Sequence, residues 1–127
     1  MDIAKLTKLF SNVFEIKKID ENNMQIRTNA NYPNGTPIVL FLEKQEKFWI
    51  LNDRKQILKF MNGLYVLDAK DIKNCIKSVM QINKMKMKNG MMFVEILNEE
   101  SLPAKVIEFI MFTAQLVNMR AFFEEPV

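Results

Sequence analysis

The residues best suited to chemistry in this sequence are two acids and a lysine that follow two neighbouring apolar runs. Glu43 comes directly after the run at 38–42. Asp53 and Lys55 come after the run at 47–51. Two carboxylates at the ends of adjacent strands are suited to holding Mg²⁺, and a nearby lysine can stabilise the charge of an attacked phosphate. This set is suited to the chemistry of a metal-dependent nuclease.

An acid followed ten positions later by an acid-x-Lys sequence resembles the motif of restriction-endonuclease-like enzymes. In those enzymes the lysine lies in the same strand as its acid, whereas Asp53 and Lys55 lead into a predicted turn and helix. A carboxylate in that place is also a good cap for the helix predicted at 57–61, because it accepts hydrogen bonds from free backbone amides. We therefore favour the cap for Asp53, and a nuclease that uses Glu43, Asp53 and Lys55 is the alternative.

The residue types that the sequence lacks exclude several kinds of site. The chain has no histidine and one cysteine, which excludes His-containing triads, His-containing metal sites and zinc sites built from several thiolates. The three glycines lie far apart and each fits a turn, so the sequence has no glycine-rich phosphate loop. Cys75 lies on the apolar stripe of a predicted helix and fits a buried structural thiol. We expect no enzymatic activity, no cofactor and no metal.

Length and composition predict a single domain over residues 1–127. The sequence is 49% hydrophobic and 26% charged, which is too apolar for a disordered chain and too charged for a membrane protein. It has neither the pattern of a signal peptide nor an apolar run that would span a membrane. The single cysteine, Cys75, fits a reducing compartment, so we expect a cytoplasmic protein.

The net charge of +3 is spread along the chain and predicts at most weak, salt-sensitive binding to nucleic acid. The candidate basic face consists of Lys84, Lys86 and Lys88, with Phe93 on the same side of a predicted hairpin. Aromatic and basic residues together can bind single-stranded nucleic acid. Lysines that keep an exposed edge strand from pairing with other chains are the commoner explanation.

Apolar periodicity predicts strands at 24–28, 38–42 and 47–51, which form a three-strand meander. Helical spacing predicts an N-terminal helix capped by Asp2, two middle helices and a C-terminal helix. A hairpin follows the middle helices. The expected order is α-β-β-β-α-α-β-β-α, an α+β fold with helices packed on an antiparallel sheet.

The hairpin is predicted from the dipeptide Asn89-Gly90, because both central residues of a type I′ turn need positive φ. This turn pairs Lys88 with Met91 and Met87 with Met92. The face expected to be buried consists of Met85, Met87, Met92, Val94 and Ile96.

The last helix is expected from about Ser101 to Met119, and its apolar residues occupy nearly the whole circumference. A helix of this kind should have a second partner besides its own sheet, and a second copy of the chain is the simplest one. Aromatic and methionine side chains are enriched in the centres of interfaces. The interface residues predicted on this basis are Phe109, Phe112, Leu116, Met119, Phe122 and Phe123.

Residues 26–123 resemble the bacterial domain of unknown function numbered 1828. The turn Leu51-Asn52-Asp53 before a short helix carries this resemblance, together with Val94-Glu95 and the helix that begins near Pro103. The glycine that usually follows the acids of that turn in the family is missing here. The resemblance implies the fold and a bacterial or phage setting, and no activity. The order of elements is also similar to that of type III secretion chaperones.

Together these observations predict a non-catalytic protein-binding module, a cytoplasmic homodimer without membrane contact. Its expected role is that of a regulator or accessory of a bacterium, phage or mobile element, for instance an inhibitor that occludes a host protein. The alternatives are the nuclease and the weak nucleic-acid-binding protein described above.

Overall fold

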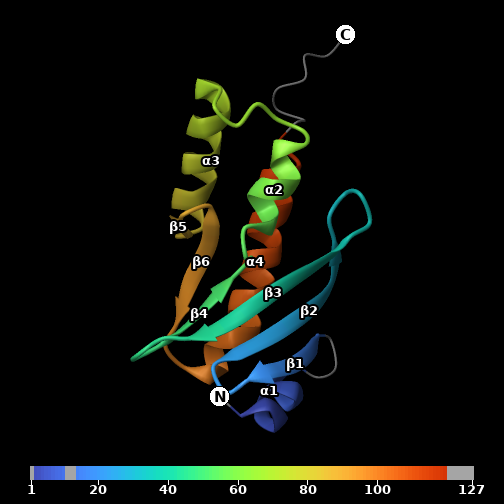
Figure 1. Ribbon diagram of the computed structural model, residues 1–127, viewed down its shortest axis with the longest axis vertical. Coiled ribbons are helices and arrows are strands. Elements are labelled where there is room, and N and C mark those ends of the chain that lie inside the picture. The colour runs from blue at the N-terminus through green and yellow to red at the C-terminus, as the bar shows by residue number, and fades with distance from the viewer. Residues whose placement is uncertain (1, 11–13, 120–127) are drawn as a thin grey trace.

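The computed structural model describes residues 2–10 and 14–119 (Figure 1). Within these residues, six strands form one antiparallel sheet that four α-helices accompany, which confirms the expected α+β fold. The elements follow one another as α1 (Ile3–Phe10), β1 (Glu15–Asp20), β2 (Asn23–Asn31), β3 (Pro37–Lys44), β4 (Trp49–Asn52), α2 (Gln56–Asn62), α3 (Lys70–Ile82), β5 (Lys86–Lys88), β6 (Met91–Ile96), the 3₁₀ helix η1 (Glu99–Ser101) and α4 (Leu102–Val117).

The strands lie in the sheet in the order β1-β2-β3-β4-β6-β5. β2, β3 and β4 correspond to the predicted meander, and β5 and β6 form the predicted hairpin. β1 is an additional strand that the sequence does not predict, because most of its residues are charged and exposed. Its backbone pairs with β2, where Ile16 lies opposite Ile26. The sheet thus includes a mostly charged, exposed edge strand that has no apolar pattern of its own.

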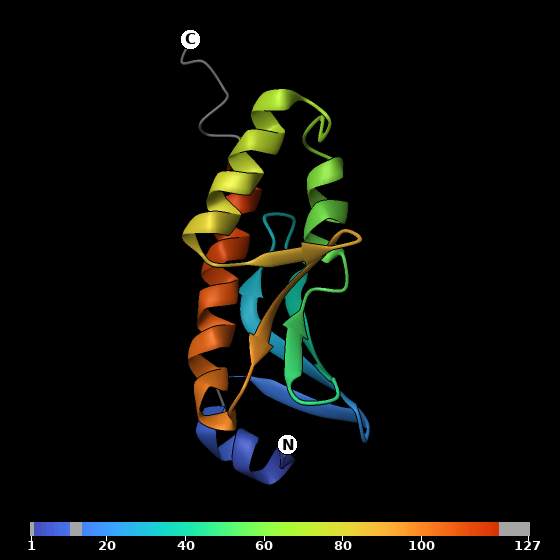
Figure 2. The ribbon, with the colours of Figure 1, turned by 90° about the vertical axis from the view of Figure 1, so that its left-hand side faces the viewer.

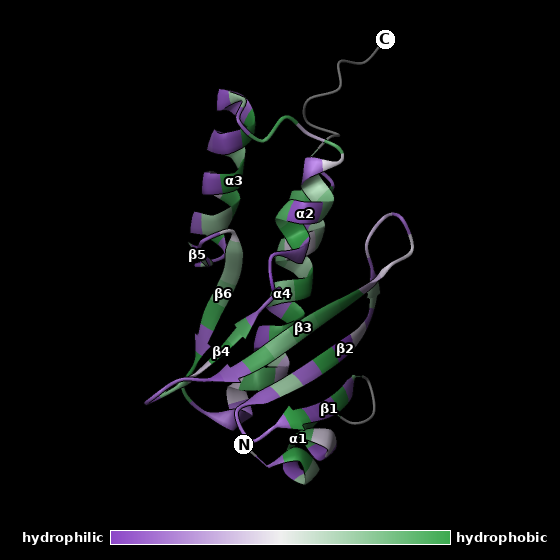
Figure 3. Cartoon of the chain, in the orientation of Figure 1, coloured by the Kyte–Doolittle hydropathy of each residue, from purple (hydrophilic) through white to green (hydrophobic). Residues whose placement is uncertain are grey.

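The helices leave one face of the sheet open. In Figure 1 the sheet faces the reader and α4 runs behind it. The side view in Figure 2 places α4 against one face of β3 and β4, and leaves the opposite face of these strands without a described helix. Figure 3 shows the apolar character of β3 and β6, and the polar residues along the outer side of α3.

The core lies between the covered face of the sheet and the helices. Leu40, Leu42 and Leu51 point from the central strands into this space and are almost completely buried. Met92 and Ile96 extend the same face across β6. At the other end of the chain, the Oδ1 atom of Asp2 accepts a hydrogen bond from the amide of Ala4 at 2.9 Å, which confirms the predicted cap of α1.

The hairpin has the predicted turn and register, but only part of the predicted buried face. Asn89 and Gly90 have φ of 53° and 81°, as a type I′ turn requires, and Met87 lies opposite Met92. Met87 is nevertheless 46% exposed, so its place in the buried face is wrong. β5 is three residues long and lies at the edge of the sheet, where the helices do not cover its side chains.

The apolar helix α4 is buried more completely within the chain than the sequence indicates. Four of the predicted interface residues have no exposed surface: Phe109, Phe112, Leu116 and Met119. They belong to the core between α4, the sheet and the middle helices, and the rings of Phe109 and Phe112 meet edge to face at 6.0 Å. The structure therefore corrects their assignment to an exposed interface. Phe122 and Phe123 lie outside the described residues.

Candidate functional site

Asp53 is buried in the turn between β4 and α2, and both of its carboxylate oxygens are engaged with the backbone. Oδ1 accepts hydrogen bonds from the amides of Lys55 and Met92, each at 3.0 Å. Oδ2 accepts one from the amide of Ile57 at 2.9 Å. Burial raises the pKa of Asp53 above its usual range, and these hydrogen bonds oppose that shift. The N-cap position of α2 is Lys55, not Asp53 as predicted, but the Asp53 carboxylate two positions earlier supplies the acceptor for the first turn of α2 and also holds the helix against β6.

The same turn contains two consecutive residues in the left-handed conformation, Arg54 with φ of 49° and Lys55 with φ of 67°. The Oδ1 atom of Asn52 accepts a hydrogen bond from the Arg54 amide at 3.0 Å and stabilises this conformation. The guanidinium carbon of Arg54 lies 4.0 Å from the centre of the Phe41 ring. Its Nε donates to Oε1 of Glu43 at 3.3 Å. The Arg54 side chain thus folds back over β3.

The three residues of the nuclease alternative do not form an open metal site in this geometry. Asp53 uses both oxygens for backbone amides, and Glu43 is paired with Arg54. Within residues 2–10 and 14–119, no group of three or more His, Cys, Asp or Glu side chains is placed to hold a metal ion. The turn has a clear structural role, and a nuclease that uses Lys55 stays a prediction without geometric support.

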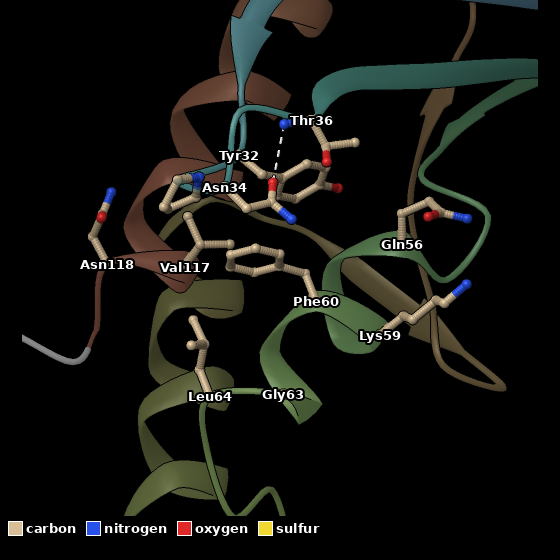
Figure 4. A pocket seen from close by; sticks show the side chains of 11 residues that line it. Tyr32, Asn34, Thr36, Gln56, Lys59, Phe60, Gly63, Leu64, Val117 and Asn118 are labelled. Carbon is tan, nitrogen blue, oxygen red and sulfur yellow. Dashed lines mark hydrogen bonds between the residues drawn. The ribbon is translucent and has the colours of Figure 1, made fainter.

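A groove of about 860 Å³ lies between the β2–β3 turn, α2 and the last turn of α4 (Figure 4). We call it the aromatic groove, because Tyr32 and Phe60 stack in it with ring centres 5.0 Å apart and planes at 25°. Leu64 and Val117 add apolar surface. Burial raises the pKa of Tyr32 far above its usual range, so this phenol stays neutral in the physiological range.

The rim of the aromatic groove is polar and well ordered by hydrogen bonds. Oδ1 of Asn34 accepts a hydrogen bond from the amide of Thr36 at 3.0 Å, which shapes the turn on one side (Figure 4). Gln56 and Asn118 contribute amides on the other sides. Among the lining residues, Lys59 is the one that carries a charge. The groove is therefore suited to an apolar or aromatic group followed by negative charge.

The sequence does not predict the aromatic groove, because its walls come from three segments that are far apart in the chain. Each segment on its own fits a turn or the stripe of a core helix. One signal was available in the turn sequence 31–35, where Tyr32 is a large aromatic residue that must find cover. Phe60 of α2 provides this cover.

The outer side of α4 carries a second apolar surface, which we call the outer stripe and define as Ala104, Ile107, Met111 and Ala114. All four residues are exposed. The two large ones, Ile107 and Met111, are 51% and 57% exposed. The first turns of α4 form the left margin of the molecule in Figure 2. The outer stripe is what remains of the all-round apolar helix once its opposite side has joined the core.

The candidate basic face is partly neutralised. Nζ of Lys86 lies 3.0 Å from Oε1 of Glu95 on the neighbouring strand. Lys84, with φ of 53°, precedes β5 and borders a hollow that also contains Glu95 and Glu108. The hollow is lined by both acidic and basic side chains, so the geometry adds no support for nucleic-acid binding.

None of the described helices combines the length and the apolar character needed to cross a membrane. Comparison with known proteins finds no match to this chain among family models, curated proteins or solved structures. The resemblance to the bacterial domain of unknown function therefore stays a prediction, and any function has to be argued from the surfaces described above.

Proposed function

We propose that this chain is a non-catalytic protein-binding module that works as a homodimer through the outer stripe of α4. The observation that carries the proposal is the exposure of Ile107 and Met111 on a helix whose other side is fully buried. Apolar side chains in such a row stay in contact with water unless a partner covers them. Burying both would contribute about 25 cal/mol for each Å² of apolar surface removed from water.

The spacing of the outer stripe supports a helix as its partner. Positions 104, 107, 111 and 114 follow one another at intervals of three, four and three, which is the spacing of a helix-to-helix seam. In an antiparallel pair of α4 helices, Met111 of each copy would face Ile107 of the other. Ala104 would then face Ala114, and these small residues let the two backbones approach closely. The stripe is thus complementary to itself.

The charges beside the outer stripe are compatible with this contact. Nζ of Lys105 lies 3.4 Å from Oε2 of Glu108 on the same helix, so the glutamate does not enter the contact as an isolated charge. The stripe is short compared with standard interfaces, which bury about 800 Å² on each partner. We therefore expect a weak dimer whose population depends on protein concentration.

The wider role that we propose is that of a regulator or accessory protein of a bacterium, phage or mobile element. Its support is the resemblance of residues 26–123 to the bacterial domain of unknown function. Binding to a host protein would occlude a surface of that protein and would require no catalysis. This agrees with the role of Asp53, whose carboxylate is engaged with backbone amides.

Sedimentation velocity over the micromolar to millimolar range tests the dimer. We expect the wild type to shift from monomer to dimer with increasing concentration, and Ile107→Glu or Met111→Glu to stay monomeric. Leu97→Glu is the matched control, because Leu97 is a 78% exposed leucine outside α4. Circular dichroism verifies that each variant is folded. A wild type that stays monomeric throughout, or glutamate variants that associate like the wild type, would refute the proposal.

A further inference from the structure

We infer that the aromatic groove is a binding site for residues 120–127 of this same chain, with Phe122 and Phe123 against the stacked rings of Tyr32 and Phe60. This inference does not depend on the homodimer, because the groove and the outer stripe are built from different residues. It rests on the position of the groove, on its chemistry and on the sequence of the segment.

The position of the groove favours this segment over a separate partner. Val117 and Asn118 line the groove, and the segment begins two residues later. The end of α4 is held in place there, because the side chain of Asn118 donates to the carbonyl of Ala114 at 2.8 Å. An extended chain spans about 3.3–3.6 Å per residue, so four residues beyond Met119 reach about 13 Å. Both phenylalanines are therefore within reach of a site whose wall is α4 itself.

The chemistry of the groove matches the order of residues in the segment. Aromatic rings prefer offset-stacked or edge-to-face contacts with other rings, and the partly exposed ring of Phe60, stacked on the buried ring of Tyr32, offers such a surface. Glu124 and Glu125 follow the two phenylalanines directly. Lys59 on the rim lies on the same helix as Phe60, one position before it. An aromatic pair followed by acids thus meets an aromatic floor bordered by a lysine.

A tethered segment has an advantage over a free peptide of the same chemistry. Short flexible connections give effective concentrations in the millimolar range, so a site whose Kd for the free segment lies below that range is largely occupied by its own chain. Such a site would take an external aromatic-acidic peptide only after the segment has left. Docking of the segment would also remove the side chains of Phe122 and Phe123 from contact with water.

Nuclear magnetic resonance on the full chain tests the inference directly. We expect nuclear Overhauser contacts between the rings of Phe122 or Phe123 and those of Tyr32 or Phe60. The double variant Phe122→Ser/Phe123→Ser should move the ring signals of Tyr32 and Phe60 and the methyl signals of Val117. Leu97→Ser is the control and should leave them in place. Absence of the contacts together with unmoved signals would overturn the inference.

Two further measurements show whether the groove is occupied by a segment of the same chain or of another chain. A sample mixed from labelled and unlabelled chains distinguishes contacts within one chain from contacts between chains, and contacts found only between chains would overturn the assignment to the same chain. Recording the same spectra on Met111→Glu keeps this test independent of the proposed dimer. Ring contacts that persist in this variant support the inference even if the dimer does not exist.

Charge reversal tests the role of the rim. Lys59→Glu should lower the docked population about two- to fivefold, the effect of losing exposed ion pairs. Glu124→Lys/Glu125→Lys in the Lys59→Glu background should restore it. Equal populations in all three proteins would overturn the assignment of Lys59 to the acidic end of the segment.

Discussion

The Oδ1 atom of Asp53 accepts a hydrogen bond from the backbone amide of Met92 at 3.0 Å, although the two residues are 39 positions apart. The amide of Asp53 in turn donates to the carbonyl of Met92 at 3.3 Å. This double contact closes the sheet between β4 and β6. Because the same carboxylate also binds the amides of Lys55 and Ile57, one side chain joins a strand, a turn and a helix.

Replacing Asp53 by alanine should destabilise the fold by about 3 kcal/mol or more, because two buried amides and one partly buried amide lose their acceptor and each unpaired buried group costs about 1–3 kcal/mol. Urea unfolding measures this loss. Asp68→Ala is the control, because the side chain of Asp68 is 98% exposed. The loss should be equal with and without Mg²⁺. A stabilising effect of Mg²⁺ that disappears with Asp53 would instead favour the metal-binding alternative.

The free energy of unfolding should depend on pH through Asp53 in a defined direction. Burial raises the pKa of Asp53 in the folded chain above the ordinary value of 3.8, so the folded chain binds a proton that the unfolded chain has released. The contribution of Asp53 is therefore fully present below pH 3.8 and declines as the pH rises through the folded pKa. The stability of Asp53→Asn relative to the wild type should increase over the same interval.

Asp20 provides the comparison of opposite sign. Hydrogen bonds from the Asn22 amide and the Asn23 side chain lower the pKa of Asp20, so its contribution is lost as the pH falls through the folded pKa. The difference in free energy of unfolding between Asp20→Asn and the wild type should therefore be smallest at acidic pH. Urea titrations across the acidic range measure both variants. Parallel pH curves for the two would contradict the assignment of burial as the dominant influence on Asp53.

Gly90→Ala should destabilise the hairpin by about 1 kcal/mol, because Gly90 has φ of 81° and an alanine is strained in that conformation. An added Cβ would lie 3.9 Å from Cδ1 of Leu58, an ordinary van der Waals contact, so the backbone conformation determines the effect. Gly63→Ala is the matched control. Gly63 has φ of −78°, which alanine adopts freely, and this change should be neutral or stabilise by about 0.5 kcal/mol. Equal effects of the two substitutions on thermal unfolding would contradict the turn type.

Phe112→Ala should cost about 3–5 kcal/mol, because it removes a fully buried ring and leaves a cavity between α4 and the sheet. Leu97→Ala, at an exposed position, should change stability by less than about 0.5 kcal/mol. Chemical denaturation monitored by Trp49 fluorescence compares them. A small loss for Phe112→Ala would mean that α4 is less tightly packed than described.

Local patterns are sufficient to predict most of this fold. The alternation at 24–28, the apolar run at 38–42 and the Asn89-Gly90 turn each specify a strand or a hairpin from neighbouring residues alone. β1 escapes prediction because backbone pairing with β2 holds it, and its side chains leave no periodic signal. Met87 has the right pattern but lies on an uncovered edge, a property of the whole sheet.

The candidate sites depend on packing that local patterns do not contain. The sequence predicts a second partner for the apolar helix α4, yet it does not show which side of the helix meets the sheet. The two aromatic rings of α4, Phe109 and Phe112, occupy the core, and the stripe around Ile107 and Met111 is left outside. The aromatic groove needs three distant segments to be placed together before it exists.

The strand order also predicts a sequence of events during folding. Strands β1 to β4 are joined by short turns, so their pairing needs little loop closure. Pairing β4 with β6 closes a loop of 39 positions between Asp53 and Met92, with an entropic cost of about 3 kcal/mol by the logarithmic dependence on loop length. We therefore expect the four-strand meander to form early, and β6 to dock in the last cooperative step together with α4. Weakening the contact between Asp53 and Met92 should then accelerate unfolding while leaving the rate of folding nearly unchanged.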